Sequence, residues 1–173
     1  MRSILLLVIA LFACGPKERA SLIAAENWTA VPLSEDPYAS FHPGTNACPP
    51  TGYGLEDLGG ENSLYIDAQD CAYLTVAQPA AVEVDEGDRI RVRIWHFALV
   101  ALDAATATIA MTVNGHSVFE AFVPIPSEGA LLPDPNLRME ADFESDAGAP
   151  VLFHLRNHGT NSYNLIELSR GGE

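Results

Sequence analysis

Short apolar runs alternate with turn-forming residues from Asn62 to the end of the chain. These runs are rich in Val, Ile, Thr and aromatic residues, and they recur about every ten residues, as in sandwiches and barrels. The pattern predicts strands over residues 63–67, 71–77, 80–84, 88–98, 105–113, 116–123, 137–143, 150–156 and 162–168. No sustained helical period is present, and at most one helical turn is expected over 98–107. We therefore predict an all-β fold, a two-sheet antiparallel β-sandwich of about eight to ten strands.

Two of the predicted turns have specific chemistry. Asn114-Gly115 lies between two β-rich runs and predicts a type I′ hairpin, in which both central residues have positive φ. The segment Asp85-Glu86-Gly87-Asp88 predicts a second hairpin connection, with Gly87 in the left-handed conformation.

The run over residues 88–98 alternates most clearly. Ile90, Val92 and Ile94 share one face, which we predict to be buried, and the intervening arginines share the other face with Trp95. His96 continues the apolar set, whereas Phe97 follows the arginines. Either a bulge reverses the alternation near Trp95, or the stripe formed by Arg91, Arg93 and Trp95 lies on a sheet surface.

The N-terminus has the pattern of an export signal. Arg2 precedes the apolar run Ile4–Phe12, and small Ala13 precedes Cys14. Nine apolar residues span about 14 Å as a helix, which is too short for a bilayer core of about 30 Å. The segment Leu11-Phe12-Ala13-Cys14 resembles the bacterial lipobox. That resemblance implies cleavage before Cys14 and acylation of its thiol, with lipid anchoring to the cell envelope, and the outer membrane is favoured because Gly15 replaces a retention aspartate.

The organisation expected from these signals has three parts. Residues 1–13 form the signal peptide, residues 14–47 form a proline-punctuated tether, and residues 48–173 form the sandwich domain. A single strand around residues 27–31 could still dock on the domain. Residues 48–60 are rich in Pro and Gly and are expected to form an irregular loop.

Three cysteines are present, and acylation of Cys14 leaves Cys48 and Cys71. An even pair in an oxidising compartment predicts a disulfide that closes a loop of about 24 residues and contributes roughly 3 kcal/mol. The alternative is a pair of free buried thiols. A thiolate zinc site is not predicted, because two isolated cysteines lack paired Cys-x-x-Cys spacing.

The chain is strongly acidic, with 23 Asp and Glu against nine Lys and Arg and a net charge of −14. Nucleic-acid binding and polybasic attachment to anionic lipid both need basic clusters, so both classes are excluded. Acidity favours solubility or cation binding.

The stripe of Arg91, Arg93 and Trp95 is the first candidate binding site. A flat aromatic ring beside hydrogen-bonding cations suits a sugar, because the ring stacks on the sugar and the guanidinium groups bind its hydroxyls. The alternative is an amphipathic strand whose arginines pair with acids and whose tryptophan belongs to the core.

Candidate metal ligands are His96, His154 and His158, which could hold zinc or another divalent metal if they converged. The alternative is that His96 and His154 are buried and hydrogen-bonded to the backbone. Two acidic loops are candidates for calcium, although neither matches the EF-hand pattern. Their acids are Asp85, Glu86 and Asp88 in one loop, and Asp142, Glu144 and Asp146 in the other.

The stretch from about Leu64 to Leu168 resembles the jelly roll of carbohydrate-binding modules and galactose-binding-like domains. The likeness rests on the strand count, on residues 84–93 (VDEGDRIRVR) and on the final segment 161–168 (NSYNLIEL). No Gly-x-Ser-x-Gly, His-Glu-x-x-His or phosphate-loop motif is present, so no catalytic residues are predicted. The preferred hypothesis is a non-catalytic envelope module that binds glycan or a protein partner. The alternatives are a metal-binding protein or metal-dependent enzyme, and a purely structural lipoprotein.

Overall fold

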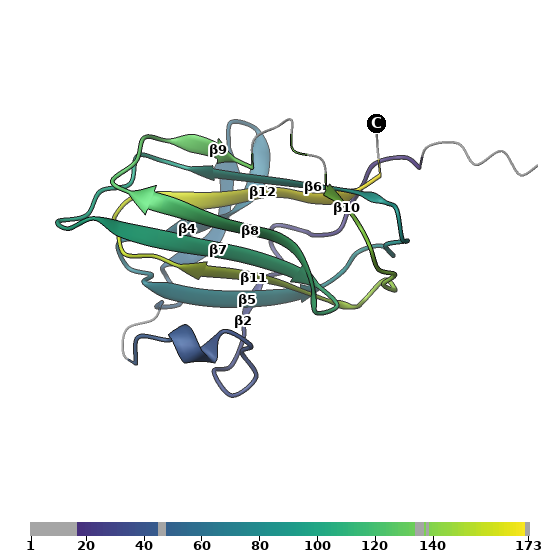
Figure 1. Cartoon of the computed structure of the whole chain (residues 1–173), viewed down its shortest axis with the longest axis horizontal. Coiled ribbons are helices and arrows are strands. Elements are labelled where there is room, and N and C mark those ends of the chain that lie inside the picture. The colour runs from purple at the N-terminus through teal and green to yellow at the C-terminus, as the bar shows by residue number, and fades with distance from the viewer. Residues whose placement is uncertain (1–16, 45–47, 134–136, 138, 172–173) are drawn as a thin grey trace, which may run out of the picture.

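The structure is a computed structural model that describes residues 17–44, 48–133, 137 and 139–171. Two antiparallel sheets pack face to face and enclose one core (Figure 1). The strands are β1 (Ala20–Ser21), β2 (Thr29–Ala30), β3 (Tyr53–Leu58), β4 (Glu61–Asp67), β5 (Tyr73–Pro79), β6 (Arg89–His96), β7 (Ala105–Val113), β8 (His116–Ile125), β9 (Ala130–Leu132), β10 (Met139–Glu140), β11 (Pro150–Arg156) and β12 (Ser162–Arg170). One 3₁₀ turn, η1 (Ala39–Phe41), accompanies them.

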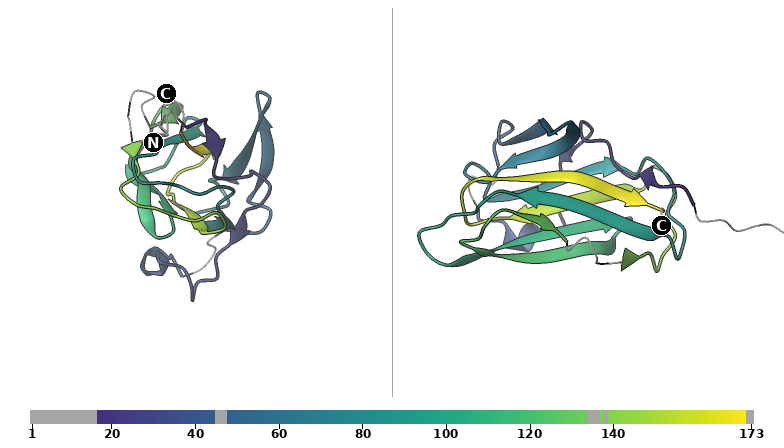
Figure 2. Two further views of the ribbon diagram at one scale, coloured as in Figure 1. Left: turned by 90° about the vertical axis from the view of Figure 1, so that its right-hand side faces the viewer. Right: turned by 90° about the horizontal axis from the view of Figure 1, so that it is seen from above.

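The larger sheet has seven strands. Its order is β10-β6-β12-β4-β3, with β1 also paired to β12 and β9 also paired to β6. The second sheet has five strands in the order β2-β5-β11-β7-β8. Figure 2 shows the two layers from the side, with the β3–β4 hairpin extending from the edge of the larger sheet. The predicted two-sheet antiparallel sandwich is confirmed.

Alternation along each strand supplies the core. Ile66, Ile94 and Leu165 enter from the larger sheet, and Ile109 and Phe153 enter from the smaller one, all at most 1% exposed. Because successive side chains in a strand point to opposite faces, the residues between these positions lie on the outer faces of the sandwich.

Several local predictions need correction. Residues 80–84 do not form a strand, because Val84 makes only a single bridge to Ser145. The turn at residues 85–88 is consequently not a hairpin, although Gly87 has the expected positive φ of 85°. The irregular loop expected over 48–60 contains β3, which pairs with β4 along its whole length. The helical turn expected over 98–107 is absent from those residues, which continue as loop into β7.

The Asn114-Gly115 hairpin is confirmed. Both residues have positive φ, 50° and 81°, and they connect β7 to β8. Of all the predicted turns this one depends least on distant contacts, because its geometry is set by two adjacent residues.

The segment predicted to be a tether, residues 14–47, is described by the structure from residue 17 to 44, and this part is packed on the sandwich. In that range β1 pairs with β12 and β2 pairs with β5. Leu22 is 0% exposed and Trp28 is 8% exposed, and both belong to the core. Burial of these two side chains attaches the segment to the sandwich despite its prolines, so the packed domain begins before Cys48.

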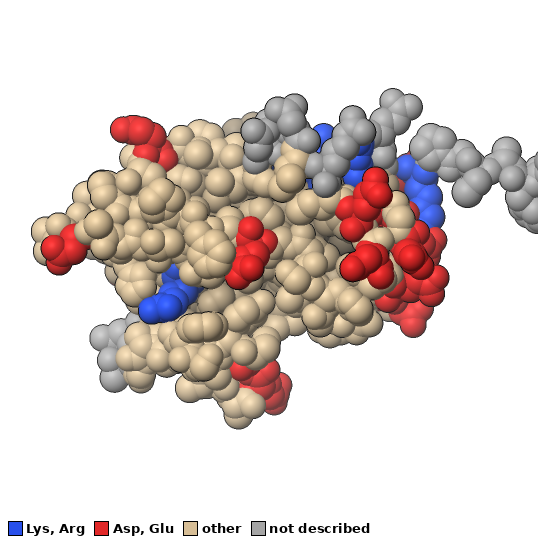
Figure 3. All heavy atoms as spheres, viewed as in Figure 1, with Lys and Arg blue, Asp and Glu red and all other residues tan. Residues whose placement is uncertain are grey.

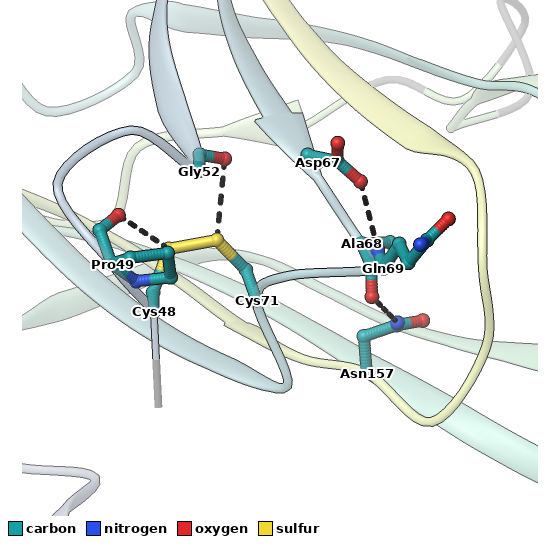
Figure 4. Close-up of a disulfide and its surroundings, with 8 residues drawn as sticks. All are labelled: Cys48, Pro49, Gly52, Asp67, Ala68, Gln69, Cys71 and Asn157. Carbon is teal, nitrogen blue, oxygen red and sulfur yellow. Dashed lines mark hydrogen bonds between the residues drawn. A yellow bond between two sulfur atoms is a disulfide. The ribbon is translucent and has the colours of Figure 1, made fainter. Parts of the chain in front are cut away.

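The predicted disulfide between Cys48 and Cys71 is present. It links the segment before β3 to the start of β5, close to Gly52 (Figure 4). Nearby, the Asn157 side-chain amide donates a hydrogen bond to the Ala68 carbonyl oxygen at 3.1 Å (Figure 4). The described part of the chain contains no helix with the length and apolar character needed to cross a bilayer.

Candidate functional site

The predicted stripe lies on the outer face of the seven-stranded sheet. Ile90, Val92 and Ile94 are at most 4% exposed, whereas Arg91 is exposed and Arg93 and Trp95 are half-buried. The register of β6 against β12 shifts only on β12, between Leu165 and Glu167. No bulge therefore reverses the alternation of β6, and Trp95 shares the outer face with the arginines. Because His96 is 2% exposed, it remains on the buried face.

Two neighbouring strands complete a row beside Trp95. Trp95 pairs with Asn164 of β12, and Asn164 pairs in turn with Tyr65 of β4. Directly paired residues in an antiparallel sheet point to the same face, so all three lie on the outer face. Trp95 and Tyr65 are two strand spacings apart, which is about 10 Å. We call Trp95, Asn164 and Tyr65 the Trp95 row.

Asn164 is fully buried between the two rings of this row. Its amide nitrogen donates hydrogen bonds to Glu56 Oε2 at 2.7 Å and to Ser63 Oγ at 3.0 Å. Among the described residues, its carbonyl oxygen Oδ1 has no hydrogen-bond partner. A buried polar atom usually has a partner, so this oxygen is an unsatisfied acceptor that lies beneath the surface of the row.

A charged network lies next to the Trp95 row. The Arg93 guanidinium donates to both carboxylate oxygens of Glu61, at 2.8 and 2.9 Å, and lies 3.6 Å from Glu167 Oε2. The hydrogen bond from Arg93 is the main reason that the pKa of Glu61 lies below its usual value. Burial acts to raise the pKa of Glu167, but hydrogen bonds from Arg19 and Ser169 outweigh burial and lower it. The two carboxylates that contact Arg93 are thus held in their ionised form.

The sequence identified only part of this arrangement. It placed Arg91, Arg93 and Trp95 on one face, and Arg93 does pair with acids, as the alternative interpretation expected of the arginines. It missed Tyr65 and Asn164. Both residues point outward from strands whose side chains alternate between the two faces. For Tyr65, which lies between the buried Leu64 and Ile66, this alternation could have been read from the sequence alone. Their position beside Trp95 depends on strand pairing.

The three predicted metal-ligating histidines do not come together. His96 lies in β6, where its Nδ1 is 3.0 Å from the carbonyl oxygen of Phe97. His154 lies in β11 of the other sheet, where its Nδ1 is 2.9 Å from Thr75 Oγ1. His158 is exposed in the turn that follows β11. His96 and His154 lie in different sheets, and each has its own hydrogen-bond partner there. The zinc-site prediction is therefore wrong.

The acidic loops meet at one end of the sandwich, where Figure 3 shows a concentration of acidic side chains. Asp85 and Asp88 both contact Lys17 there, the latter at 3.2 Å. Within residues 17–44, 48–133, 137 and 139–171, no group of three or more His, Cys, Asp or Glu side chains is arranged to hold a metal ion. The calcium interpretation of these loops is therefore not supported either.

No protein-family model matches this chain, and no curated protein is significantly similar to it in sequence. Among solved structures it is similar to a family 29 carbohydrate-binding module (TM-score 0.37, 13% identity, covering 69% of this chain and 73% of that one). It is also similar to the second N-terminal cellulose-binding domain of β-1,4-glucanase C from Cellulomonas fimi (TM-score 0.34, 16% identity, covering 87% and 97%).

A third similar structure is an arabinose-bound α-L-arabinofuranosidase, with a TM-score of 0.39 and 11% identity over 68% of this chain. The chain spans 21% of that enzyme's length. Likenesses this distant establish neither a family nor a ligand for the chain.

Proposed function

We propose that this protein is a non-catalytic glycan-binding module anchored to the cell envelope, and that the Trp95 row is its binding face. One observation carries the proposal: Trp95 and Tyr65 lie on the same outer face, and the ordered Arg93–Glu61 pair lies on that face next to them. Aromatic rings offer apolar faces to the C–H surface of a sugar, and polar groups beside them bind its hydroxyls.

The surroundings of the row favour a neutral, hydroxyl-rich ligand. Arg93 and Glu61 neutralise each other through two hydrogen bonds, and Glu56 accepts one from Asn164. These groups still have lone pairs and N–H groups for hydroxyls, while their positions are fixed by the network. A binding face whose side chains are already ordered loses less conformational entropy when the ligand binds.

Trp95→Ala tests the glycan proposal. We would titrate the protein with soluble cello-, xylo-, manno- and chito-oligosaccharides and with peptidoglycan fragments, and measure heat by calorimetry. Removing the ring should weaken binding at least tenfold, and Tyr65→Ala should do the same, because ring stacking is lost. The matched control is Leu102→Ala, which truncates a fully exposed apolar side chain in a loop, 105% exposed. No binding to any of these glycans, or equal binding by the Trp95 variant, would refute the proposal.

The envelope part of the proposal rests on the sequence of residues 1–14. Lys17 is the first described residue, and three residues span at most about 11 Å. An acyl group on Cys14 would thus hold the domain next to the bilayer. Cys14→Ser should move the protein from the membrane fraction to the soluble extracytoplasmic fraction, whereas Cys48→Ser should leave it in the membrane fraction. Recovery of an unacylated wild-type chain would contradict the anchor.

A further inference from the structure

The outer face of the five-stranded sheet carries a second row of side chains. Arg156 of β11 pairs with Thr108 of β7, and Thr108 pairs with Phe122 of β8. Each has an inward-pointing core neighbour in sequence, so all three point outward. Phe41 of η1 lies against this face, with its ring centroid 5.8 Å from the Arg156 guanidinium carbon. We call Phe41, Arg156, Thr108 and Phe122 the Phe122 row.

The two rings of this row are accessible, because Phe122 is 65% exposed and Phe41 is 53% exposed. Thr108 and Arg156 are half-buried between them. Figure 3 looks onto this face, which bears few charged side chains, in contrast to the acidic end of the molecule. It also shows a basic side chain set in a hollow of the surface. Exposed aromatic rings grouped around a polar centre are typical of a binding surface.

The Arg156 guanidinium is held in position by the ring of Phe41. Although the chain has 23 Asp and Glu, none of the described carboxylates forms an ion pair with Arg156, whereas Arg19, Arg93 and Arg170 are all paired. The planar guanidinium group binds a carboxylate through two parallel hydrogen bonds. Arg156 is therefore suited to a ligand that carries a carboxylate.

Polar side chains lie beside the Phe122 row, two residues further along the paired strands. Glu120 of β8 pairs with Ala110, which pairs with His154, and the ring of Tyr38 stacks on His154. From this register, Glu120 is two strands and two residues away from Arg156, or about 12 Å between Cα atoms. Glu120 forms no ion pair with Arg156 in the described part of the chain, while its carboxylate and the Tyr38 hydroxyl can bind ligand hydroxyls.

We propose that the Phe122 row is a second binding site, for a saccharide that bears a carboxylate. The sugar carboxylate would bind the Arg156 guanidinium, a sugar ring would stack on Phe122, and Thr108 and Glu120 would bind hydroxyls. This site goes beyond the function proposed above, because it lies on the opposite face of the sandwich and takes a charged ligand.

The test uses the full-length protein in detergent and three probes: oligogalacturonate, alginate oligomers and hyaluronan oligomers. We expect at least one probe to bind, and expect its binding to weaken with added salt. Phe122→Ala and Arg156→Lys should each weaken it at least tenfold, the first by removing the ring and the second by replacing the forked group with a point charge. Methyl esterification of the probe's carboxylates should weaken binding by a similar factor. Trp95→Ala should leave it unchanged.

Three outcomes would overturn this proposal: no binding to any of the three probes, equal affinity for the methyl ester, or binding that survives Phe122→Ala but is lost in Trp95→Ala. Because Phe122 is exposed and Lys keeps the charge of Arg156, both variants should fold, and near-ultraviolet circular dichroism would verify this. The Trp95 row is tested through the effect of Trp95→Ala on neutral oligosaccharides, so failure of one proposal leaves the other standing.

Discussion

The rings of Tyr38 and His154 stack face to face, with 4.1 Å between their centroids and 11° between their planes. Tyr38 belongs to the N-terminal segment that the sequence predicts to be a tether, and His154 lies in β11. Tyr73 packs edge-on against the same imidazole, and its hydroxyl donates to the Asp36 carboxylate. These contacts leave His154 1% exposed, and burial lowers its pKa to about 4.

This depressed pKa predicts loss of stability in mild acid. In the unfolded chain the histidine has a pKa of about 6.5, so between pH 6.5 and 4 the unfolded state binds the extra proton and is favoured. The stability present above pH 6.5 should therefore decrease as the pH falls toward 4. We expect the free energy of unfolding at pH 5 to be lower than at pH 7.5 by about 2 kcal/mol, measured by urea denaturation.

His154→Gln is the control for that measurement. Glutamine can retain a hydrogen bond to Thr75 but cannot take up a proton in this range, so the decrease between pH 7.5 and 5 should largely disappear. An unchanged decrease in this variant would show that other groups cause the acid sensitivity.

Leu22 tests whether the N-terminal segment belongs to the folded domain. Its side chain is 0% exposed, so Leu22→Ala should lower the free energy of unfolding by about 2–5 kcal/mol through lost burial and a cavity. The matched variant Leu33→Ala, in the same segment but 50% exposed, should change it by less than about 0.5 kcal/mol. Equal small effects, measured by denaturant unfolding, would mean that the segment contributes little to the fold.

Gly52 is predicted to be intolerant of any side chain. A Cβ atom there would lie 2.6 Å from Cys71 Sγ and 3.2 Å from Cys48 Sγ, so Gly52→Ala must displace the disulfide or the backbone. We expect a loss of about 1–3 kcal/mol, the usual cost of overpacking. Gly54→Ala is the control, because nothing lies within 4 Å of its added Cβ. A thermal melt that ranks the two variants equally would refute this account.

Much of the fold follows from short-range patterns. The alternation of Ile90, Val92 and Ile94 identifies the buried face of β6, and Asn114-Gly115 identifies its hairpin, because both depend only on residues adjacent in the chain. The disulfide was predictable for a related reason, since the cysteine count and the export signal leave one even pair. The strand predicted over 80–84 was wrong because only Val84 finds a partner there, the distant Ser145. The loop expected over 48–60 was wrong for a local reason, because Gly59 and Gly60 take positive φ and connect β3 to β4 in a hairpin.

The composition of both candidate sites depends on contacts between segments far apart in the chain. The outward direction of Trp95 follows from alternation within β6, but its neighbours Asn164 and Tyr65 follow from the order and register of β6, β12 and β4. The same is true of Phe122 and Arg156, and of the separation of His96 and His154 into different sheets. Because side chains alternate along a strand, the sequence of one strand is enough to assign each residue to a face. The order and register of the strands depend instead on how all of them bury their apolar faces together, which the sequence of one strand does not determine.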